Sequence, residues 1–441
     1  MNVNSVPNQQ QHRAARTPRP RRWAAVVATL ALSLGVLTAC GGNGGGSGSD
    51  GGDKVLRLAM GSPGKAQMRV WESIADQFEK QNSGWTVEIN FMDDDQYQTV
   101  GLPNLLKGRQ APDLYFEWVG DRLATRVEDG FAADLTPYLD TTFKGIWNPS
   151  LFDKATVDGK VALIPHMADV TTVLWYNKSL FADNGLTPPA TMDELIGECA
   201  TFDKAGVPMI ALGNKDLWPA GNFFSMIASR VVGPELYDST MRGETSFDDP
   251  QWRAAFEQIK AIADAGCVND SASAINDNEG AQLFFQGKAA THPIGSWLVS
   301  WAVDEAPKLD FDFVNIPAVT DGAGDQTSVM GVMTGYVINE HSTHKDQAAA
   351  FMALANSPEN VDAFIGAEAV PLALSAADNP AIDDRTARLN DLLATAGTII
   401  SPPDTGYDIE RADALYQAIS QVLGGEATPE KAVDMLVEET S

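Results

Sequence analysis

Strand and helix patterns alternate from residue 55 onward, and this order limits the fold more than any other feature of the chain. An apolar run covers 55–60, apolar residues alternate over 87–91, and a further buried strand is indicated at 113–119. A helix at about 96–107 separates the last two. The helix after the first strand has one apolar face, made of Trp71, Ile74, Ala75 and Phe78. This βαβαβ beginning predicts an α/β fold with a parallel sheet and helices packed outside it.

Two later helices have clear start signals. Thr191 and Glu194 form a capping-box pattern ahead of an amphipathic stretch that should end at Gly206. Thr428 is a predicted N-cap with Pro429 in the first turn of the last helix.

The first 39 residues have the pattern of an export signal. Five arginines precede a short apolar segment at 23–37, and Leu37-Thr38-Ala39 leads to Cys40. The pattern resembles a bacterial lipoprotein signal, which implies that 1–39 is removed and that Cys40 carries the lipid anchor. A transmembrane anchor is the alternative, but the run is shorter than the roughly 20 apolar residues of a span. A twin-arginine signal at Arg21-Arg22 fits poorly with the residues that follow.

Residues 40–52 are dominated by Gly and Ser, which predicts a flexible tether. We therefore expect an exported body held at the extracytoplasmic face of the cell membrane. Without the leader, the chain has 26 basic against 59 acidic residues, a net charge of −33. Such a charge argues against nucleic acid and against direct binding to anionic lipid.

Roughly 400 mature residues exceed what one core usually organises, so two domains are expected. Cys199 and Cys267 are the other cysteines in the chain. An oxidising compartment permits a disulfide between them, while their helical context fits buried free thiols equally well. The sequence leaves both alternatives open.

Several short motifs, taken in order, resemble the extracellular solute-binding proteins (family 1) of carbohydrate ABC importers, with the maltose-binding group nearest. The early motifs are 78–80 (FEK), 108–113 (GRQAPD), 130–139 and 175–178 (WYNK). The later ones are 285–290 (FQGKAA), 295–297 (GSW) and the final Gly424 to Thr428-Pro429-Glu430 segment. Together they cover about 380 residues.

This resemblance implies a two-lobe periplasmic-binding-protein-like (type II) fold with discontinuous lobes, a hinge and an interlobe ligand cleft. The first lobe would take 53–166 plus 315–370, and the second 167–314 plus 371–441. Crossings are expected near Pro165-His166-Met167, Ile316-Pro317 and Val370-Pro371. Prolines there would restrict closure to a few torsions, although they also suit ordinary loops.

The implied function is capture of a mono- or oligosaccharide and its delivery to permease subunits. No Walker motif is found, so the ATPase would be another chain. We expect a monomer without a cofactor or metal. A peptide, a polyamine or an anionic compound is the alternative ligand, and the negative body with its aromatic residues favours neutral saccharides.

A sugar site needs a flat apolar wall for the CH face and charged or amide groups for the hydroxyls. Trp297 occupies the position where the resemblance implies an aromatic platform, and Asp169 lies where it implies a carboxylate. Glu117 and Trp118 end a strand at the expected cleft. The other candidate ligand residues are Ser62, Asp94, Trp218, Asn222, Met333, Glu368, Asp404 and Tyr407. Trp71 and Trp175 are predicted core residues.

Other chemistry has little support in the sequence. Asp93-Asp94-Asp95 lacks the spacing and the glycine of a calcium loop. His341 and His344 flank a helix start, where capping explains them better than zinc does. A secreted glycoside hydrolase would also be acidic and tryptophan-rich, but no catalytic motif is recognisable, so we expect a binding protein and not an enzyme.

Overall fold

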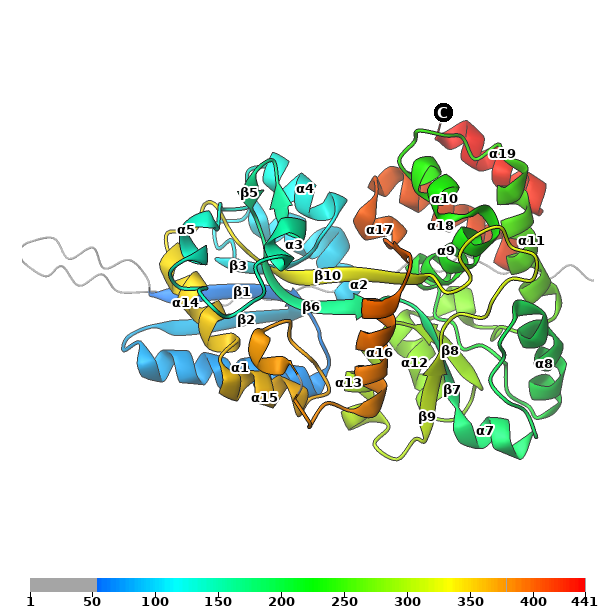
Figure 1. Cartoon of the computed structure of the whole chain (residues 1–441), viewed down its shortest axis with the longest axis horizontal. Coiled ribbons are helices and arrows are strands. Elements are labelled where there is room, and N and C mark those ends of the chain that lie inside the picture. The colour runs from blue at the N-terminus through cyan, green and yellow to red at the C-terminus, as the bar shows by residue number, and fades with distance from the viewer. Residues whose placement is uncertain (1–53, 378, 441) are drawn as a thin grey trace, which may run out of the picture. The chain divides into compact units, whose positions relative to one another are not determined.

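The computed structural model describes residues 54–377 and 379–440, which belong to one compact unit. The expected signal, the tether and Cys40 lie outside these residues. Two groups of elements, each with its own sheet and core, make up the unit (Figure 1). We call them the first lobe, around strands β1, β2 and β3, and the second lobe, around β7, β8 and β9.

The first lobe begins with the expected βαβαβ order. Its early elements are β1 (Val55–Gly61), α1 (Lys65–Gln81), β2 (Thr86–Met92), α2 (Asp94–Gln96), the π-helical turn η1 (Tyr97–Gly101), α3 (Leu102–Leu106) and β3 (Leu114–Trp118). Strands β2 and β3 flank β1, and both run parallel to it. The predicted parallel sheet is therefore confirmed, whereas the helix expected at 96–107 is three short segments.

The other elements of the first lobe cover this sheet. They are α4 (Asp121–Glu128), α5 (Thr136–Leu139), α6 (Leu151–Lys154), β4 (Thr156–Val157), β5 (Lys160–Val161), α14 (Lys345–Ala355), α15 (Pro358–Ile365) and the 3₁₀ turn η3 (Leu374–Ala376). Strand β1 alternates between two cores, because Leu58 packs with Trp71 and Phe78 on one face while Ala59 packs with Tyr97 on the other. Trp71 is buried as predicted.

The second lobe is mainly helical around an antiparallel sheet of order β8-β7-β9. Its elements up to residue 314 are β7 (Val173–Asn177), α7 (Lys178–Asp183), α8 (Met192–Lys204), α9 (Trp218–Val232), α10 (Pro234–Met241), α11 (Pro250–Asp264), the 3₁₀ turn η2 (Ala272–Ala274), α12 (Asp277–Phe285), β8 (Thr291–Ile294), α13 (Leu298–Glu305) and β9 (Phe311–Val314). Its later elements are α16 (Asp384–Thr395), β11 (Ile399–Ile400), α17 (Pro403–Gly406), α18 (Ile409–Leu423) and α19 (Pro429–Glu439).

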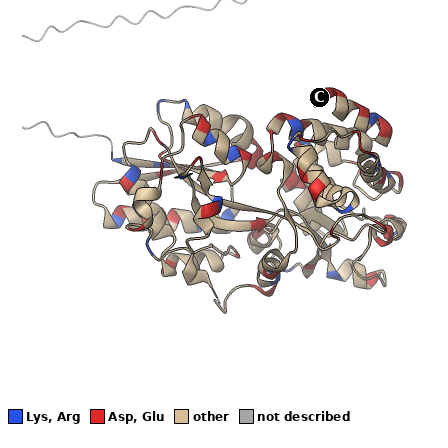
Figure 2. Ribbon diagram, turned by 45° about the horizontal axis from the view of Figure 1, so that its top comes forward, with Lys and Arg blue, Asp and Glu red and all other residues tan. Residues whose placement is uncertain are grey.

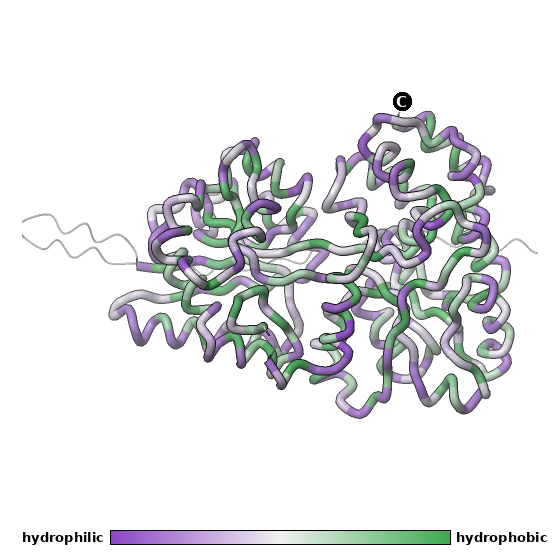
Figure 3. The backbone as a smooth tube through the Cα atoms, viewed as in Figure 1, coloured by the Kyte–Doolittle hydropathy of each residue, from purple (hydrophilic) through white to green (hydrophobic). Residues whose placement is uncertain are grey.

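Local signals in the second lobe match the structure. The Thr191–Glu194 capping box is formed at the start of α8, which ends just before Gly206, and Thr428 caps α19. Trp175 is fully buried. Cys199 and Cys267 form a disulfide inside the largest core, which decides between the alternatives that the sequence left open. Figure 3 shows how hydrophobic and hydrophilic residues alternate along these helices.

The lobes are joined by an antiparallel pair of strands, β6 (Ile164–Val170) and β10 (Val329–Ile338). Ile164 at the start of β6 packs in the first-lobe core, and Val170 at its end packs in the second. Strand β10 returns from Met330 in the second-lobe core to Ile338 in the first. Figure 1 shows both strands running between the lobes.

These contacts favour different boundaries for the second and third expected crossings. Because Ile316 packs in the second-lobe core, we propose that the second crossing lies along β10, later than Ile316-Pro317. Ala376 still packs with helix α15 of the first lobe, whereas Leu389 of α16 packs in the second. We therefore propose a third crossing between η3 and α16, after Val370-Pro371. With these proposed boundaries, the prolines at 317 and 371 would lie in loops within a lobe.

Candidate ligand-binding site

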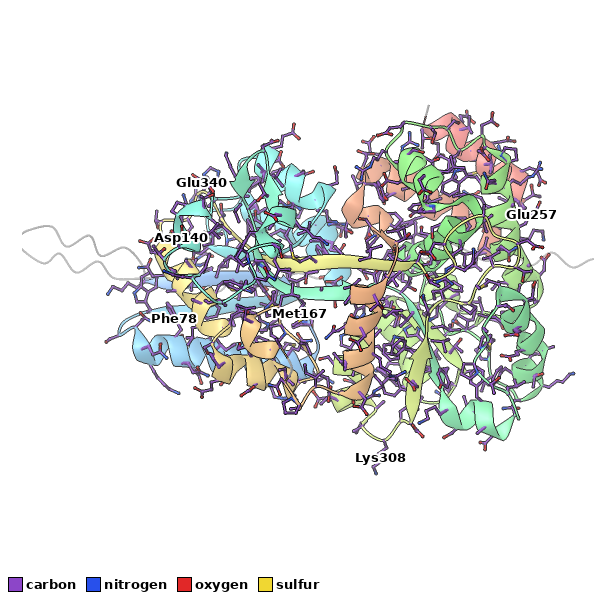
Figure 4. All side chains as sticks on the ribbon, in the orientation of Figure 1. Phe78, Asp140, Met167, Glu257, Lys308 and Glu340 are labelled. Atoms are coloured by element: carbon purple, nitrogen blue, oxygen red, sulfur yellow. A yellow bond between two sulfur atoms is a disulfide. The ribbon has the colours of Figure 1, made fainter. Side chains whose placement is uncertain are left out.

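A cavity of about 770 Å³ lies between the two lobes. This volume is within the range of about 300–1,000 Å³ that small-molecule sites occupy. The first lobe lines it with residues 60–65 and 93–95 and with the end of β3, and the second with the starts of α9, α12 and α17 and with α13. The crossing strands β6 and β10 complete the lining. Met167 of β6, which is labelled in Figure 4, is one of these residues.

Indole rings from the second lobe form one wall. Trp218 starts helix α9, Trp297 precedes α13, and their ring centroids are 6.1 Å apart. Gly295 makes room for the Trp297 ring, because a Cβ atom at this position would lie 2.1 Å from it. Trp301 of α13 also lines the cavity. These faces are suited to the apolar CH surface of a ring-shaped ligand.

Trp118 contributes an aromatic surface from the first lobe. Its ring meets Phe116 edge-on at 4.7 Å, and the Arg122 guanidinium lies over it at 5.4 Å. The side chain is at the carboxyl end of β3, which is the edge where the sequence predicted it.

Asp169 places a carboxylate on the crossing strand β6. Its Oδ1 accepts a hydrogen bond of 2.8 Å from Ser296 Oγ, so the carboxylate is tied to the loop that carries Trp297. Burial raises the pKa of Asp169 to about 6. The second carboxylate oxygen is available to accept from a ligand hydroxyl.

Two loops of the first lobe reach the cavity after strands β1 and β2. Asp94 accepts a 2.6 Å hydrogen bond from Gln98, and burial raises its pKa to about 6. Ser62 also lines the cavity, with its backbone N–H bonded to the carbonyl oxygen of Met92.

The second lobe adds Asn222 and Asp404. Asn222 lies on α9, where its Oδ1 accepts a 3.2 Å hydrogen bond from the Tyr416 hydroxyl. Asp404 lies in the short helix α17, and burial raises its pKa. Arg122 of the first lobe donates to the Asp404 carbonyl oxygen at 2.8 Å, so this contact joins the two lobes. Eight of the predicted residues thus line one cavity: Ser62, Asp94, Trp118, Asp169, Trp218, Asn222, Trp297 and Asp404.

The other four predicted residues lie elsewhere. Glu117 is fully buried and forms a 2.8 Å ion pair with Arg126, because it points to the face of β3 opposite Trp118. Met333 points away from the cavity in the same manner, while its neighbours Val332 and Thr334 line it.

Tyr407 and Glu368 are also outside the lining. The Tyr407 hydroxyl donates to Asp238 at 2.9 Å, and the ring is packed in the second-lobe core. Glu368 has a left-handed backbone with φ of 56°, and burial raises its pKa. Neither residue is brought to the ligand space in this structure.

A family profile described as bacterial extracellular solute-binding protein matches residues 62–362, more than half of the chain. This chain belongs to that family. Its fold is the type II fold of periplasmic solute-binding proteins, which confirms the expected fold class.

Individual relatives agree with this assignment. An uncharacterised ABC transporter extracellular-binding protein from Pyrococcus horikoshii is 24% identical over 344 residues, covering 77% of each chain. A structure from work on xylan utilisation by Caldanaerobius polysaccharolyticus has a TM-score of 0.80 at 26% identity, covering 87% of this chain and 99% of that one. A chitin oligosaccharide binding protein has a TM-score of 0.79 at 22% identity, covering 88% and 98%.

Sequence reasoning missed several polar groups in the cavity of this solute-binding protein, among them His166 and Thr171. His166 is 2% exposed, and its ring nitrogens have no hydrogen-bond partner among the described residues. It lies among Trp71, Tyr336 and Phe364 with centroid distances of 5.1–5.4 Å, and burial lowers its pKa to about 3. Thr171 is buried with an equally unpartnered hydroxyl. His166 is part of the predicted first crossing, and Thr171 follows it closely in sequence, so this position was the available signal.

Side chains also connect the lobes around the cavity. Helix α1 meets α13 through the ion pairs Lys65–Glu305 and Arg69–Asp304 and through a 3.0 Å hydrogen bond from Gln67 to Ser300. On another side, Trp218 Nε1 donates to Asp95 at 3.0 Å. The solute-binding protein is thus held in a form in which both lobes touch.

No helix in the described part of the chain is long and apolar enough to cross a membrane. Within the same residues, no three His, Cys, Asp or Glu side chains are arranged to hold a metal ion.

Proposed function

We propose that this protein is the receptor of a carbohydrate ABC importer, which captures a mono- or oligosaccharide between its lobes and delivers it to membrane permease subunits. A separate chain would supply the ATPase. The observation that carries the proposal is the interlobe cavity, in which indole faces of Trp218 and Trp297 lie beside carboxylates from both lobes. The xylan and chitin oligosaccharide contexts of the similar structures support a saccharide ligand.

The energetics are sufficient for a small saccharide. Covering about 80 Å² of sugar CH surface on an indole stabilises the complex by roughly 2 kcal/mol. Hydrogen bonds to charged groups such as Asp94 and Asp169 add about 1.5–3 kcal/mol each when water is excluded. A few such contacts reach micromolar affinity, which corresponds to about −8 kcal/mol.

Anchoring through lipid on Cys40 at the extracytoplasmic face of the membrane is part of the proposal. It rests on the signal-like leader and the Gly/Ser tether of residues 40–52. Globomycin treatment of expressing cells, which blocks lipoprotein signal cleavage, should leave the uncleaved precursor. Processing of the precursor that is insensitive to globomycin would contradict the anchor.

Calorimetric titration of the mature protein tests the ligand. The panel contains xylo-, malto- and chito-oligosaccharides, galactose, a tripeptide and putrescine. We expect micromolar or tighter binding of at least one saccharide, recovered unchanged afterwards. If only the tripeptide or putrescine binds, the ligand is not a saccharide and the proposal is wrong on this point. Cleavage of a bound oligosaccharide would show that the protein is a glycoside hydrolase.

A further inference from the structure

One end of the interlobe cavity concentrates carboxylates from both lobes. Asp94 and Asp95 follow strand β2 of the first lobe, and Asp277 begins helix α12 of the second. Asp216, in the loop before α9, hydrogen-bonds with Asp95. Figure 2 shows that acidic residues are spread over both lobes, but these four interact with one another.

Burial and the neighbouring carboxylates raise the pKa values of Asp95 and Asp277. Burial, then Asp216, then Asp94 raise the pKa of Asp95 to about 7. Burial first, and then the charges of Asp95, Asp94 and Asp216, hold the pKa of Asp277 well above its usual range. Protonation of Asp95 and Asp277 therefore offsets part of the repulsion within this group.

Few cations of the protein itself can balance this group. Lys65 is engaged by Glu305. Arg122 lowers the pKa of Asp94 through its charge, but it lies over Trp118 and donates to the Asp404 carbonyl oxygen. Lys215 is the other basic residue that lines the cavity in the described part of the chain.

Asp277 also has an oxygen without a donor. The side chain lines the cavity and is 4% exposed, and Oδ1 has no hydrogen-bond partner among the described residues. Nε2 of His292 lies 3.8 Å from this oxygen, beyond hydrogen-bond distance. His292 uses Nδ1 for a 2.9 Å hydrogen bond with the Ala211 carbonyl oxygen, and burial lowers its pKa to about 4, so Nε2 carries no proton at neutral pH.

We propose that the saccharide bound by this protein carries a protonated amino group, which lies among Asp94, Asp95 and Asp277. The inference rests on the proposed saccharide function and names the ligand's charge. A hydroxyl donates one hydrogen bond to one carboxylate and brings no charge to offset the others, whereas an ammonium group offers three donors and a positive charge. A bound metal ion is disfavoured, because no metal-holding geometry occurs within the described residues.

Two disaccharides of nearly equal shape provide the test. Chitobiose carries amino groups where cellobiose has hydroxyls, so the two differ in charge at pH 6, below the pKa of about 7.7 of an α-amino group. We expect calorimetry at pH 6 to show chitobiose binding at least tenfold more tightly than cellobiose. Diacetylchitobiose, in which the amines are neutral amides, should also bind less tightly than chitobiose.

Proton release gives a second readout of the same contact. Because carboxyls that pair with an ammonium group lose their protons, chitobiose should release protons, which is measured as a dependence of the binding enthalpy on the ionisation enthalpy of the buffer. Cellobiose should release none.

Variants assign the effect to the acidic group. Asp277→Asn and, independently, Asp95→Asn should each reduce the preference for chitobiose by about tenfold. Asp140→Asn, which removes a charge from an exposed first-lobe residue labelled in Figure 4, should leave it unchanged. Circular dichroism verifies that the variants fold. If one of the two Asn variants does not fold, the other, which lies on the opposite lobe, still tests the inference.

The outcomes separate the inference from the function on which it rests. Chitobiose that binds no better than cellobiose, or not at all while neutral saccharides bind, overturns the amino-group inference and leaves the saccharide receptor intact. Absence of binding by every saccharide overturns both. A preference that survives in both Asn variants overturns the assignment to this acidic group.

Discussion

At the residue scale, Trp297 is the side chain on which the saccharide proposal depends most. Its indole lines the cavity beside Trp218. The ring occupies space that is free because Gly295 has no side chain. Trp297→Ala should weaken binding of the best saccharide of the panel by tenfold or more, because a stacking surface worth roughly 2 kcal/mol is removed. Calorimetry measures this change.

Trp85→Ala is the matched control for this substitution. Trp85 is half-buried in the first lobe, where its ring meets His344 edge-on at 5.0 Å, outside the cavity. The Trp85 substitution also removes an indole ring, but that ring does not line the cavity. Unchanged affinity in the Trp297 variant would show that this ring is not part of the binding surface.

Buried cavity carboxyls give the ligand-free protein a characteristic pH dependence. The pKa values of Asp94 and Asp169 are raised to about 6, and that of Asp95 to about 7, above the roughly 3.9 of an unfolded Asp. Between about pH 4 and 7 these carboxyls therefore bind more protons in the folded protein than in the unfolded chain, and Asp277, whose pKa is also raised, adds to them. His166 and His292, whose pKa values burial lowers to about 3 and 4, act in the opposite direction. Because the raised carboxyls outnumber the two histidines, the free energy of unfolding should fall as the pH rises through this window.

Thermal unfolding without ligand should accordingly show a higher Tm at pH 5 than at pH 7.5. Carboxyls with a lowered pKa, such as Asp238 beside Arg242, lose their contribution only below about pH 4, so they do not disturb the comparison. Asp95→Asn, which removes one raised carboxyl facing Asp94 and Asp216, should reduce the difference, and Asp140→Asn should not. A Tm that rises with pH over this range in the unsubstituted protein would refute the prediction.

The end of a predicted strand indicated which segment reaches the cavity, but not which of its side chains face the ligand. The end of β3 reaches the cavity as expected, but Glu117 and Trp118 point to opposite faces, and the sequence does not tell which face is the ligand side. His166 and Asp277 were missed because their lack of hydrogen-bond partners depends on neighbours from distant segments. Local pattern carries no information on such contacts.

At the element scale, the disulfide fastens helix α8 to the segment after α11 in the second lobe. Cys199 and Cys267 are 68 residues apart in sequence and both buried. Replacing both by Ala should lower the free energy of unfolding of this lobe by about 4 kcal/mol, since a closed loop of this length restricts the unfolded chain. Denaturant unfolding measures the loss.

Ligand affinity at 25 °C should be unchanged in the same variant, because neither cysteine lines the cavity. Addition of a reductant to the unsubstituted protein should reproduce the loss of stability. Equal unfolding curves for the variant and the parent would show that the cross-link contributes no stability.

Elements were predictable where their signals are local. Capping residues at Thr191 and Thr428 and the apolar periodicity of α1 predicted these helices correctly. The segment 94–106 is divided by a π-helical turn that periodicity does not reveal. The pairing of β6 with β10, which sets the lobe crossings, depends on contacts between residues more than 160 positions apart.

At the scale of the whole molecule, the strength of the ion pairs between the lobes bears on the role proposed for the ligand. The ion pairs between α1 and α13 involve largely exposed side chains, which water and salt screen, so they contribute little. Stronger contacts would have to come from a solute that touches both lobes. Such a solute shifts the population toward the shut form by its differential affinity for that form.

We expect the lobes to move relative to each other about the strand pair β6 and β10. Strands β6 and β10 pass between two separate cores, with an irregular register between Thr334 and Gly335. A hinge at this pair would change few torsions and leave each core intact.

Small-angle X-ray scattering of the mature protein, with and without a saturating concentration of the tightest saccharide of the panel, tests most directly whether a solute draws the two lobes together. We expect the radius of gyration to decrease on saturation, with Trp297→Ala requiring at least tenfold more saccharide for the same change. A scattering profile that is identical before and after calorimetrically verified saturation would contradict closure of the lobes on a captured solute.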